Sequence, residues 1–274
     1  MRNTPLAPLT AAVLAMALLL GGCQSVQTTQ PGAVGVTRAQ SMSVSREEVD
    51  AASAKAYAQL LQESQAKGVL NRDAAMLARV QGVSRRLIAQ TAAFRPDAPG
   101  WRWEVNLLTS DEVNAFCMAG GKIAVYSGII TKLQLSDDEL AAVIGHEMAH
   151  ALREHVREQV SEQQNLGLLA AIAGAALGSQ TAAQGAGQLS QLVVGLPHSR
   201  RAETEADDIG VELAARAGFD PRAAVGLWDK MGRLGGGRPP EFLSTHPSPA
   251  NRQQDLQRAA QVVMPLYQQA TRRR

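Results

Sequence analysis

The chain has 274 residues, 45% of them hydrophobic and 19% charged, with a formal net charge of +2. This near-neutral charge excludes the strongly basic composition typical of nucleic-acid-binding proteins, so we expect no nucleic-acid partner. The length allows one domain with a sizeable core once an amino-terminal targeting segment and linker are set aside.

The amino-terminal segment has the features of a secretory signal. Arg2 precedes an apolar run at 9–20, which is shorter than the ~20 residues needed to span a bilayer. The sequence Leu-Gly-Gly-Cys that ends at Cys23 resembles a bacterial lipobox, in which the cysteine is lipidated. An ordinary signal peptide with a chance cysteine is the alternative. We expect 1–22 to be a lipoprotein signal peptide and Cys23 to carry the lipid, and Gln24 favours the outer membrane.

Three further segments follow from the composition. Residues 23–45 are rich in Gln, Ser, Thr and Gly with little apolar periodicity, which predicts a flexible tether. Residues 46–265 form the expected domain, and 266–274 a basic tail. With Cys23 lipidated, Cys117 has no partner for a disulfide in the mature chain, so we expect a buried thiol.

The expected elements of the domain begin with two helices, at about 46–65 and 73–93. Alternating apolar residues predict a strand at 101–108. A hairpin follows, with strands at 114–118 and 123–126 around a glycine pair. The remainder favours helices. The fold class is therefore α+β, mostly helical, with one small β-sheet.

One helix carries a motif with metal-binding chemistry. Ser136 and Glu139 have the spacing of a capping box, which places a helix start there. His146 and His150 then project from the same helix face and can converge on one tetrahedral zinc ion. Glu147 lies to the side, where it can act as a general base toward a water molecule. We expect one Zn²⁺ per chain.

A catalytic zinc needs a third protein ligand. Some zinc proteases take a histidine six residues after the second one, but Val156 stands there after His150. A glutamate from a later helix is the other source. Glu203 and Asp207 share one helix face, so Glu203 can ligate the metal while Asp207 holds a ligand histidine by its other ring nitrogen. Glu205, on another face, is the next candidate.

With these residues the sequence resembles the HtpX/CAAX-prenyl-protease family of zinc metallopeptidases, in its soluble periplasmic lipoprotein branch. Further matching stretches are 111–116, 121–128 and 245–249 with Arg252. The resemblance runs from about 45 to 260, and it implies a zincin-type domain. The multiple membrane-spanning segments of other branches have no counterpart here.

The resemblance implies roles for residues around the metal. Asn114 and Ala115 would form the cleft edge that pairs with an extended substrate, or Asn114 would only be a turn residue. His246 follows a glycine- and proline-rich loop, and would either latch the open metal position or pack structurally. From the sequence itself, His198 is an oxyanion donor or a helix cap, and Arg252 a substrate or oxyanion contact or a salt-bridge residue.

Two features outside these motifs carry weaker expectations. His155 is five residues past the second histidine of the motif, and we expect it at the surface or in a second layer. The alanine- and glycine-rich run at 166–178 is about 13 residues long, short of the ~17 needed to span a membrane. A helical hairpin packed over the active site is our interpretation, with membrane contact as the alternative.

These observations favour a membrane-tethered zinc endopeptidase that hydrolyses misfolded or damaged cell-envelope proteins. It would be an outer-membrane lipoprotein facing the periplasm, held by its lipid anchor, with unfolded envelope polypeptides as substrates. A chaperone-like assembly factor with low or latent proteolytic activity is the main alternative, but a pure binding module has no need of Glu147. A structural metal site is the third, although such sites are usually closed by four ligands, often cysteines.

Overall fold

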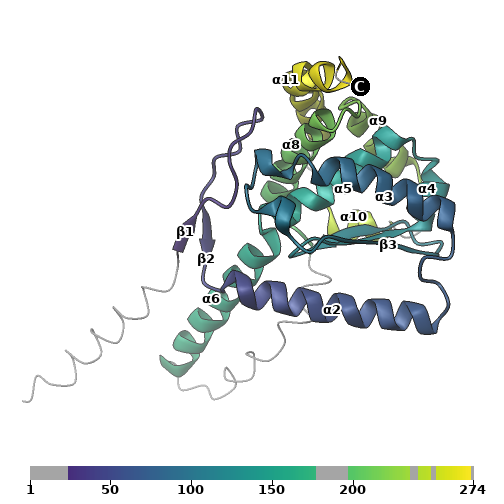
Figure 1. The fold of residues 1–274 in the computed structure, drawn as a ribbon. Helices are drawn as coiled ribbons and strands as arrows, with labels where there is room; N and C mark the ends of the chain where they lie inside the picture. Colours follow the sequence, from purple (N-terminus) through teal and green to yellow (C-terminus); the bar gives the residue numbers. More distant parts are fainter. Residues whose placement is uncertain (1–23, 177–196, 235–239, 248–250, 273–274) are drawn as a thin grey trace, which may run out of the picture.

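The computed structural model describes residues 24–176, 197–234, 240–247 and 251–272, whose arrangement is shown in Figure 1. Helices dominate, with a three-stranded sheet and a separate two-stranded sheet, so the expected α+β, mostly helical fold class is confirmed. The strands are β1 (Gln24–Val26), β2 (Gln40–Met42), β3 (Glu104–Leu108), β4 (Ala115–Met118) and β5 (Lys122–Tyr126). The helices are α2 (Arg46–Ala66), α3 (Ala74–Ile88), α4 (Ser127–Leu133), α5 (Asp137–Leu152), α6 (His155–Ala176), α8 (Arg200–Arg216), α9 (Ala223–Arg233), α10 (Glu241–Thr245) and α11 (Arg252–Arg272), with 3₁₀ turns η2 (Thr91–Ala93) and η3 (Ala98–Gly100).

The three-stranded sheet has the order β3-β5-β4, so β4 lies at its edge. Strands β4 and β5 are antiparallel and form the hairpin that the sequence predicts, whereas β3 and β5 are parallel. The turn of the hairpin holds Gly120 and Gly121 at φ values of 74° and 84°. A side chain at Gly121 would also meet the ring of Trp103 at 2.7 Å, so only glycine fits there.

The two faces of this sheet pack against different helices (Figure 1). Ile123 and Val125 of β5 point into the main core, together with apolar residues of α3 and α5. Ala124, between them in the chain, packs with Tyr57 of α2 on the opposite face. This alternation is the period-two pattern of a strand buried on both sides.

The amino-terminal segment 24–45 is packed on the domain, which differs from the flexible tether predicted for 23–45. β1 and β2 pair antiparallel, and Val36 between them joins the main core. Two backbone N–H groups of the segment donate to the carboxylate of Glu212 on α8. Arg38 donates to carboxylates of α6 and α8. The segment is thus held mainly by polar contacts with residues distant in the sequence. Such contacts require no periodic apolar residues, so the sequence pattern does not indicate them.

The carboxy-terminal helix also runs past the predicted boundary at residue 265. α11 continues to Arg272, and Leu266 and Tyr267 pack against the main core. The segment 266–274 was expected to be a basic tail because its last residues are arginines. Its first half instead extends the apolar face of α11, even though Pro265 lies inside the helix.

Several expectations fall on residues that are not described. The signal peptide 1–22 and Cys23 lie outside the described residues. In the run at 166–178, α6 continues to Ala176, and the rest of the expected hairpin lies outside them. Within the described ranges, no helix combines the length and apolar character required to cross a bilayer.

Candidate metal site

Helix α5 carries the histidine motif in its last two turns. The helix begins at the predicted capping box, in which the Ser136 side chain accepts from the Glu139 N–H and the Glu139 carboxylate accepts from the Ser136 N–H. The cap fixes the helix start, and the four-residue spacing then aligns His146 with His150. His146, Glu147 and His150 are 4%, 3% and 2% exposed. Such buried polar groups need partners within the protein.

Helix α8 crosses α5 at a contact between two glycines. A Cβ atom on Gly145 would lie 2.8 Å from the carbonyl oxygen of Gly210, and one on Gly210 would lie 2.7 Å from the backbone nitrogen of His146. Glycine alone allows two backbones to approach this closely. The crossing brings Glu203 and Asp207 of α8 against the histidines of α5. Sequence reasoning missed this pair, although isolated glycines inside helical patterns are a signal of close packing.

Four side chains from three segments meet in one buried cluster: His146 and His150 of α5, Glu203 of α8 and His246, which follows α10. One ligand atom from each lies within 4.8 Å of the others. His146 Nε2 is 3.1 Å from His150 Nε2 and 3.2 Å from His246 Nδ1. Glu203 Oε1 is 3.4 Å from His150 Nε2 and 3.0 Å from His246 Nδ1.

This donor set fits a single metal ion. Two ligand atoms at ~2.0–2.1 Å from a tetrahedral ion lie about 3.3–3.4 Å apart, within a few tenths of an ångström of the separations in the cluster. Three imidazole nitrogens and a carboxylate oxygen that face one another are mostly acceptors, so they are better satisfied by a cation than by each other. The predicted ligands His146, His150 and Glu203 are thus brought together, with His246 beside them.

Asp207 lies beside the His146 ring nitrogen that is turned away from the cluster. This nitrogen, Nδ1, lies 2.9 Å from Asp207 Oδ1. Arg252 donates to Asp207 Oδ1 at 2.8 Å and lies 3.2 Å from Glu203 Oε2. The Arg252 guanidinium also covers the Trp228 ring, 3.2 Å from its centroid, and the residue is 2% exposed. These contacts fit the salt-bridge alternative for Arg252 and leave it little access to a substrate.

The electrostatics of the cluster favour positive charge at its centre. Burial alone would lower the pKa of His146, but hydrogen bonds with Asp207 and Glu203 outweigh it and raise the pKa to about 9. Burial would raise the pKa of Glu203, but hydrogen bonds from the three cluster histidines hold that pKa well below its usual range. A cation, whether a proton or a metal ion, is therefore stabilised there.

Glu147 lies between the cluster and the edge strand β4. Its Oε1 is 3.3 Å from His246 Nε2, and the nearby Cys117 backbone amide favours the ionised carboxylate. Burial raises the pKa of Glu147, as suits a general base. The Asn114 C=O accepts from β5, so the antiparallel alternation turns the backbone groups of Ala115 and Cys117 away from β5, where the Ala115 N–H donates to the Asn114 side chain. Both predicted cleft residues therefore lie at this edge.

Two more histidines surround His150. The His198 ring stacks on the His150 ring at a centroid distance of 3.9 Å. His155 Nδ1 lies 2.9 Å from His150 Nδ1, and His155 is 2% exposed, so of its two predicted places the second layer is the observed one. Glu205, the reserve ligand, bonds Arg153 and His155 and stays outside the cluster.

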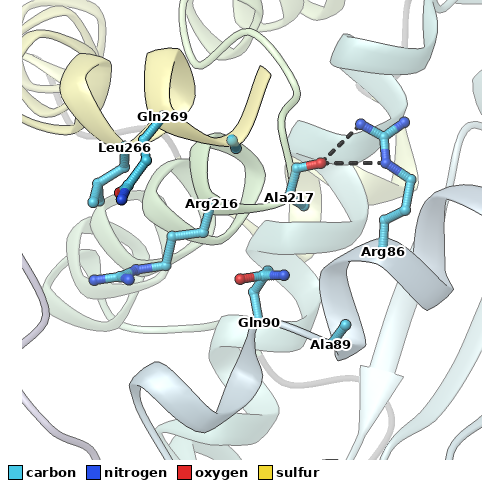
Figure 2. A pocket seen from close by; sticks show the side chains of 8 residues that line it. Arg86, Ala89, Gln90, Arg216, Ala217, Leu266 and Gln269 are labelled. Carbon is cyan, nitrogen blue, oxygen red and sulfur yellow. Dashed lines mark hydrogen bonds between the residues drawn. The ribbon is translucent and has the colours of Figure 1, made fainter. Parts of the chain in front are cut away.

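A separate pocket of about 390 Å³ lies between α3, the end of α8 and α11 (Figure 2). Arg86 donates to the Ala217 carbonyl there at 2.8 and 3.2 Å, and Arg216 pairs with Glu212 at 2.7 Å. None of the four cluster residues lines this pocket. It is therefore distinct from the metal site.

The sequence profile of peptidase family M48 matches residues 75–260, which include the histidine motif of α5 and Glu203 of α8. The chain belongs to peptidase family M48. As an M48 metallopeptidase, it is a hydrolase of peptide bonds, and the four-residue cluster is where its metal ion fits.

Similarity to individual M48 peptidases supports the assignment. The chain is 39% identical to the mitochondrial metalloendopeptidase OMA1 of Arabidopsis thaliana over 176 residues, covering 64% of this chain and 35% of that protein. It is 31% identical to the metalloprotease LoiP of Escherichia coli over 246 residues, covering 89% of this chain and 92% of LoiP. It is 29% identical to the β-barrel assembly-enhancing protease of Escherichia coli, covering 60% of this chain and 36% of that protein. The chain thus spans about a third of OMA1 but nearly all of LoiP.

Proposed function

We propose that this M48 peptidase uses zinc to cleave misfolded or damaged proteins of the bacterial cell envelope. The observation that carries the enzymatic part is the buried cluster, whose ligand atoms have the separations of a tetrahedral site, with Glu147 beside it. We assign His146, His150 and Glu203 as metal ligands. Asp207 orients His146 through its second ring nitrogen.

In this mechanism Glu147 carries the proton transfers. A zinc ion held by the ligands would polarise a water molecule and the carbonyl of the scissile bond. Glu147 accepts a proton from the attacking water and returns it to the departing amine, so the carboxylate begins and ends each cycle ionised. The nearby Cys117 backbone amide favours the ionised form of this carboxylate. His198, stacked on His150, is the candidate donor to the carbonyl oxygen as it gains charge.

The edge strand β4 explains why the substrate should be unfolded. The C=O groups of Ala115 and Cys117 face away from β5, whereas the Ala115 N–H already donates to the Asn114 side chain, so an extended peptide would add to β4 mainly through its own N–H donors. Only a segment free of its own sheet or helix offers its backbone in this way. Such pairing would place the peptide next to the Glu147 carboxylate, which lies near the Cys117 backbone.

His246 keeps this site closed in our proposal. Its ring lies against His146, Glu203 and Glu147, where a substrate carbonyl would need to enter. The ring also stacks on Phe242 of α10 at 4.4 Å, and the Phe242 N–H donates to the Val113 C=O just before β4. Helix α10 would therefore cover the cleft edge and the metal together. A purely structural role for His246 is the alternative.

The envelope location is supported by two features of the sequence. The lipobox-like sequence at Cys23 would anchor the chain to the outer membrane, with the peptidase domain in the periplasm. The similarity to LoiP extends over 92% of that protein, and another relative is named for β-barrel assembly. Unfolded envelope polypeptides are the substrates that such a location would supply.

The contacts of His246 favour a second candidate function. A chaperone-like assembly factor would hold client chains and seldom cleave them, and a latched active site is compatible with that role.

Degradation of an unfolded test protein such as reduced casein separates the two functions. Wild-type protein loaded with zinc should cleave it, and Glu147→Gln should bind zinc normally without cleaving, because Glu147 moves protons and does not hold the metal. Glu63→Gln, on the exposed side of α2, is the matched control and should cleave like wild type. Cleavage by Glu147→Gln at the wild-type rate would exclude the mechanism. Protection of the test protein from aggregation, equal in both proteins and without cleavage, would favour the chaperone.

A further inference from the structure

The two α5 histidines of the cluster differ in the group that faces their Nδ1 atom, the ring nitrogen turned away from the cluster. His146 Nδ1 faces a carboxylate directly, with Asp207 Oδ1 at 2.9 Å. His150 Nδ1 instead faces the Nδ1 of His155, also at 2.9 Å. The other nitrogen of His155, Nε2, lies 3.1 Å from Glu205 Oε2. A second imidazole is thus inserted between His150 and its carboxylate.

The protons of the hydrogen-bonded chain His150–His155–Glu205 can be arranged in one consistent order. A hydrogen bond between two imidazole nitrogens requires one donor and one acceptor. With Nε2 of His150 directed at the cluster, its Nδ1 carries the proton and donates to His155 Nδ1. His155 then carries its own proton on Nε2 and donates it to Glu205. Every nitrogen in the chain is used once, and each ring has a single tautomer.

Glu205 is fixed at the end of this chain by two guanidinium groups. Arg153 Nε and Nη2 donate to Glu205 Oε2 at 3.0 and 2.9 Å. Arg38, from the amino-terminal segment, donates to both carboxylate oxygens of Glu205. Arg153 is fully buried and also bonds the Arg38 carbonyl at 2.9 Å. These pairs keep the carboxylate ionised and hold its position.

We propose that His155 and Glu205 are positioning residues that fix the ring orientation and tautomer of the metal ligand His150. Arg38 holds Glu205 from the amino-terminal segment, so that segment forms part of the metal site's support. The inference rests on the proposed function in one respect, the role of His150 as a ligand. Removal of such outer partners typically lowers metal affinity by about 10–100-fold.

A merely structural polar network would behave differently. Glu158 is the matched control, because it also pairs with Arg38 and accepts from Gln40 at 2.8 Å, but it is not bonded to the ring of His155. Glu158→Gln therefore disturbs the same network without breaking the His150–His155–Glu205 chain. A structural role predicts similar effects of the two changes on stability and on metal binding.

The test is the zinc dissociation constant, measured by competition with a chromophoric chelator, alongside urea unfolding. His155→Ala should bind zinc about 10–100-fold more weakly than wild type. Added imidazole should restore part of that affinity by filling the vacated ring site. Glu158→Gln should keep an affinity near that of wild type even where it lowers stability. Should His155→Ala fail to fold, His155→Asn, whose side-chain oxygen can still accept from His150 but which is too short to reach Glu205, should show the same loss.

Wild-type zinc affinity in a folded His155 variant would overturn the proposal, as would an equal loss in Glu158→Gln. A wild-type protein that binds no zinc would instead contradict the proposed function. The two failures are therefore distinguishable.

Discussion

Alanine in place of Gly210 should force helices α5 and α8 apart and loosen the metal site between them. The new Cβ atom would lie 2.7 Å from the backbone nitrogen of His146 and 2.9 Å from the carbonyl carbon of Gly145. Ordinary contacts begin near 3.4 Å, so the backbones must separate by about 0.7 Å. Both neighbours are helix backbone, which cannot move aside as a flexible side chain can.

Two opposing effects set the magnitude. Alanine stabilises an unstrained helical glycine position by about 0.5–1 kcal/mol, whereas overpacking a core costs about 1–3 kcal/mol. We expect a net loss of about 1–2 kcal/mol in the free energy of unfolding. The site should suffer more, because metal–ligand distances are held within about ±0.2 Å and the shift displaces Glu203 from His146. Zinc affinity and cleavage should fall at least about tenfold.

Urea unfolding, chelator competition and cleavage of an unfolded substrate measure the three effects. Gly226→Ala is the matched control, since Gly226 is an exposed glycine of α9 with no atom within 4 Å of the added Cβ. It should be as stable as wild type or slightly more so, and fully active. A Gly210→Ala protein that matches Gly226→Ala in stability, zinc affinity and rate would refute the role of the glycine contact.

Three further predictions concern single residues. His246→Ala should retain zinc and cleave an unfolded substrate faster; a stable, zinc-loaded variant with an unchanged or lower rate would reject the latch. Cys23→Ser should move the protein from the membrane fraction to the soluble periplasmic fraction, and persistent membrane association would point to another anchor. Burial raises the pKa of Asp208 to about 7, with Asp207 and Asp255 adding to the rise. Because this folded-state pKa lies above the unfolded value of about 3.9, wild type loses stability as the pH rises from about 4 through 7. The free energy of unfolding of Asp208→Asn, measured with urea, should therefore rise relative to that of wild type between pH 5 and pH 8. A difference in unfolding free energy that does not change with pH would count against the raised pKa of Asp208.

The chemistry of the cluster could be predicted because its residues follow local rules. The capping box at Ser136 and the four-residue spacing of the histidines determine which side chains share a face of α5. The same spacing places Glu203 and Asp207 on one face of α8. Glu203 accordingly lies in the cluster, and Asp207 lies beside the His146 ring. The hairpin of β4 and β5 was also evident, because its turn requires glycine.

Other features depend on contacts between distant residues, which no local period reveals. The Gly145–Gly210 crossing sets the distance between α5 and α8, yet each glycine looks like an ordinary weak helix position. The amino-terminal segment looked disordered because it has few apolar residues, but Arg38 and its partners hold it in place. His155 was ambiguous between surface and interior until its bonds to His150 and Glu205 were known.

Titration of zinc into metal-free protein, with cleavage of an unfolded substrate followed at each step, tests the zinc peptidase site most directly. If His146, His150 and Glu203 hold one zinc ion as proposed, the rate should rise in proportion to added zinc and level off at about one zinc per chain. Glu203→Ala should show no such endpoint. Cleavage that does not depend on zinc, or a Glu203→Ala protein that titrates like wild type, would contradict the assignment.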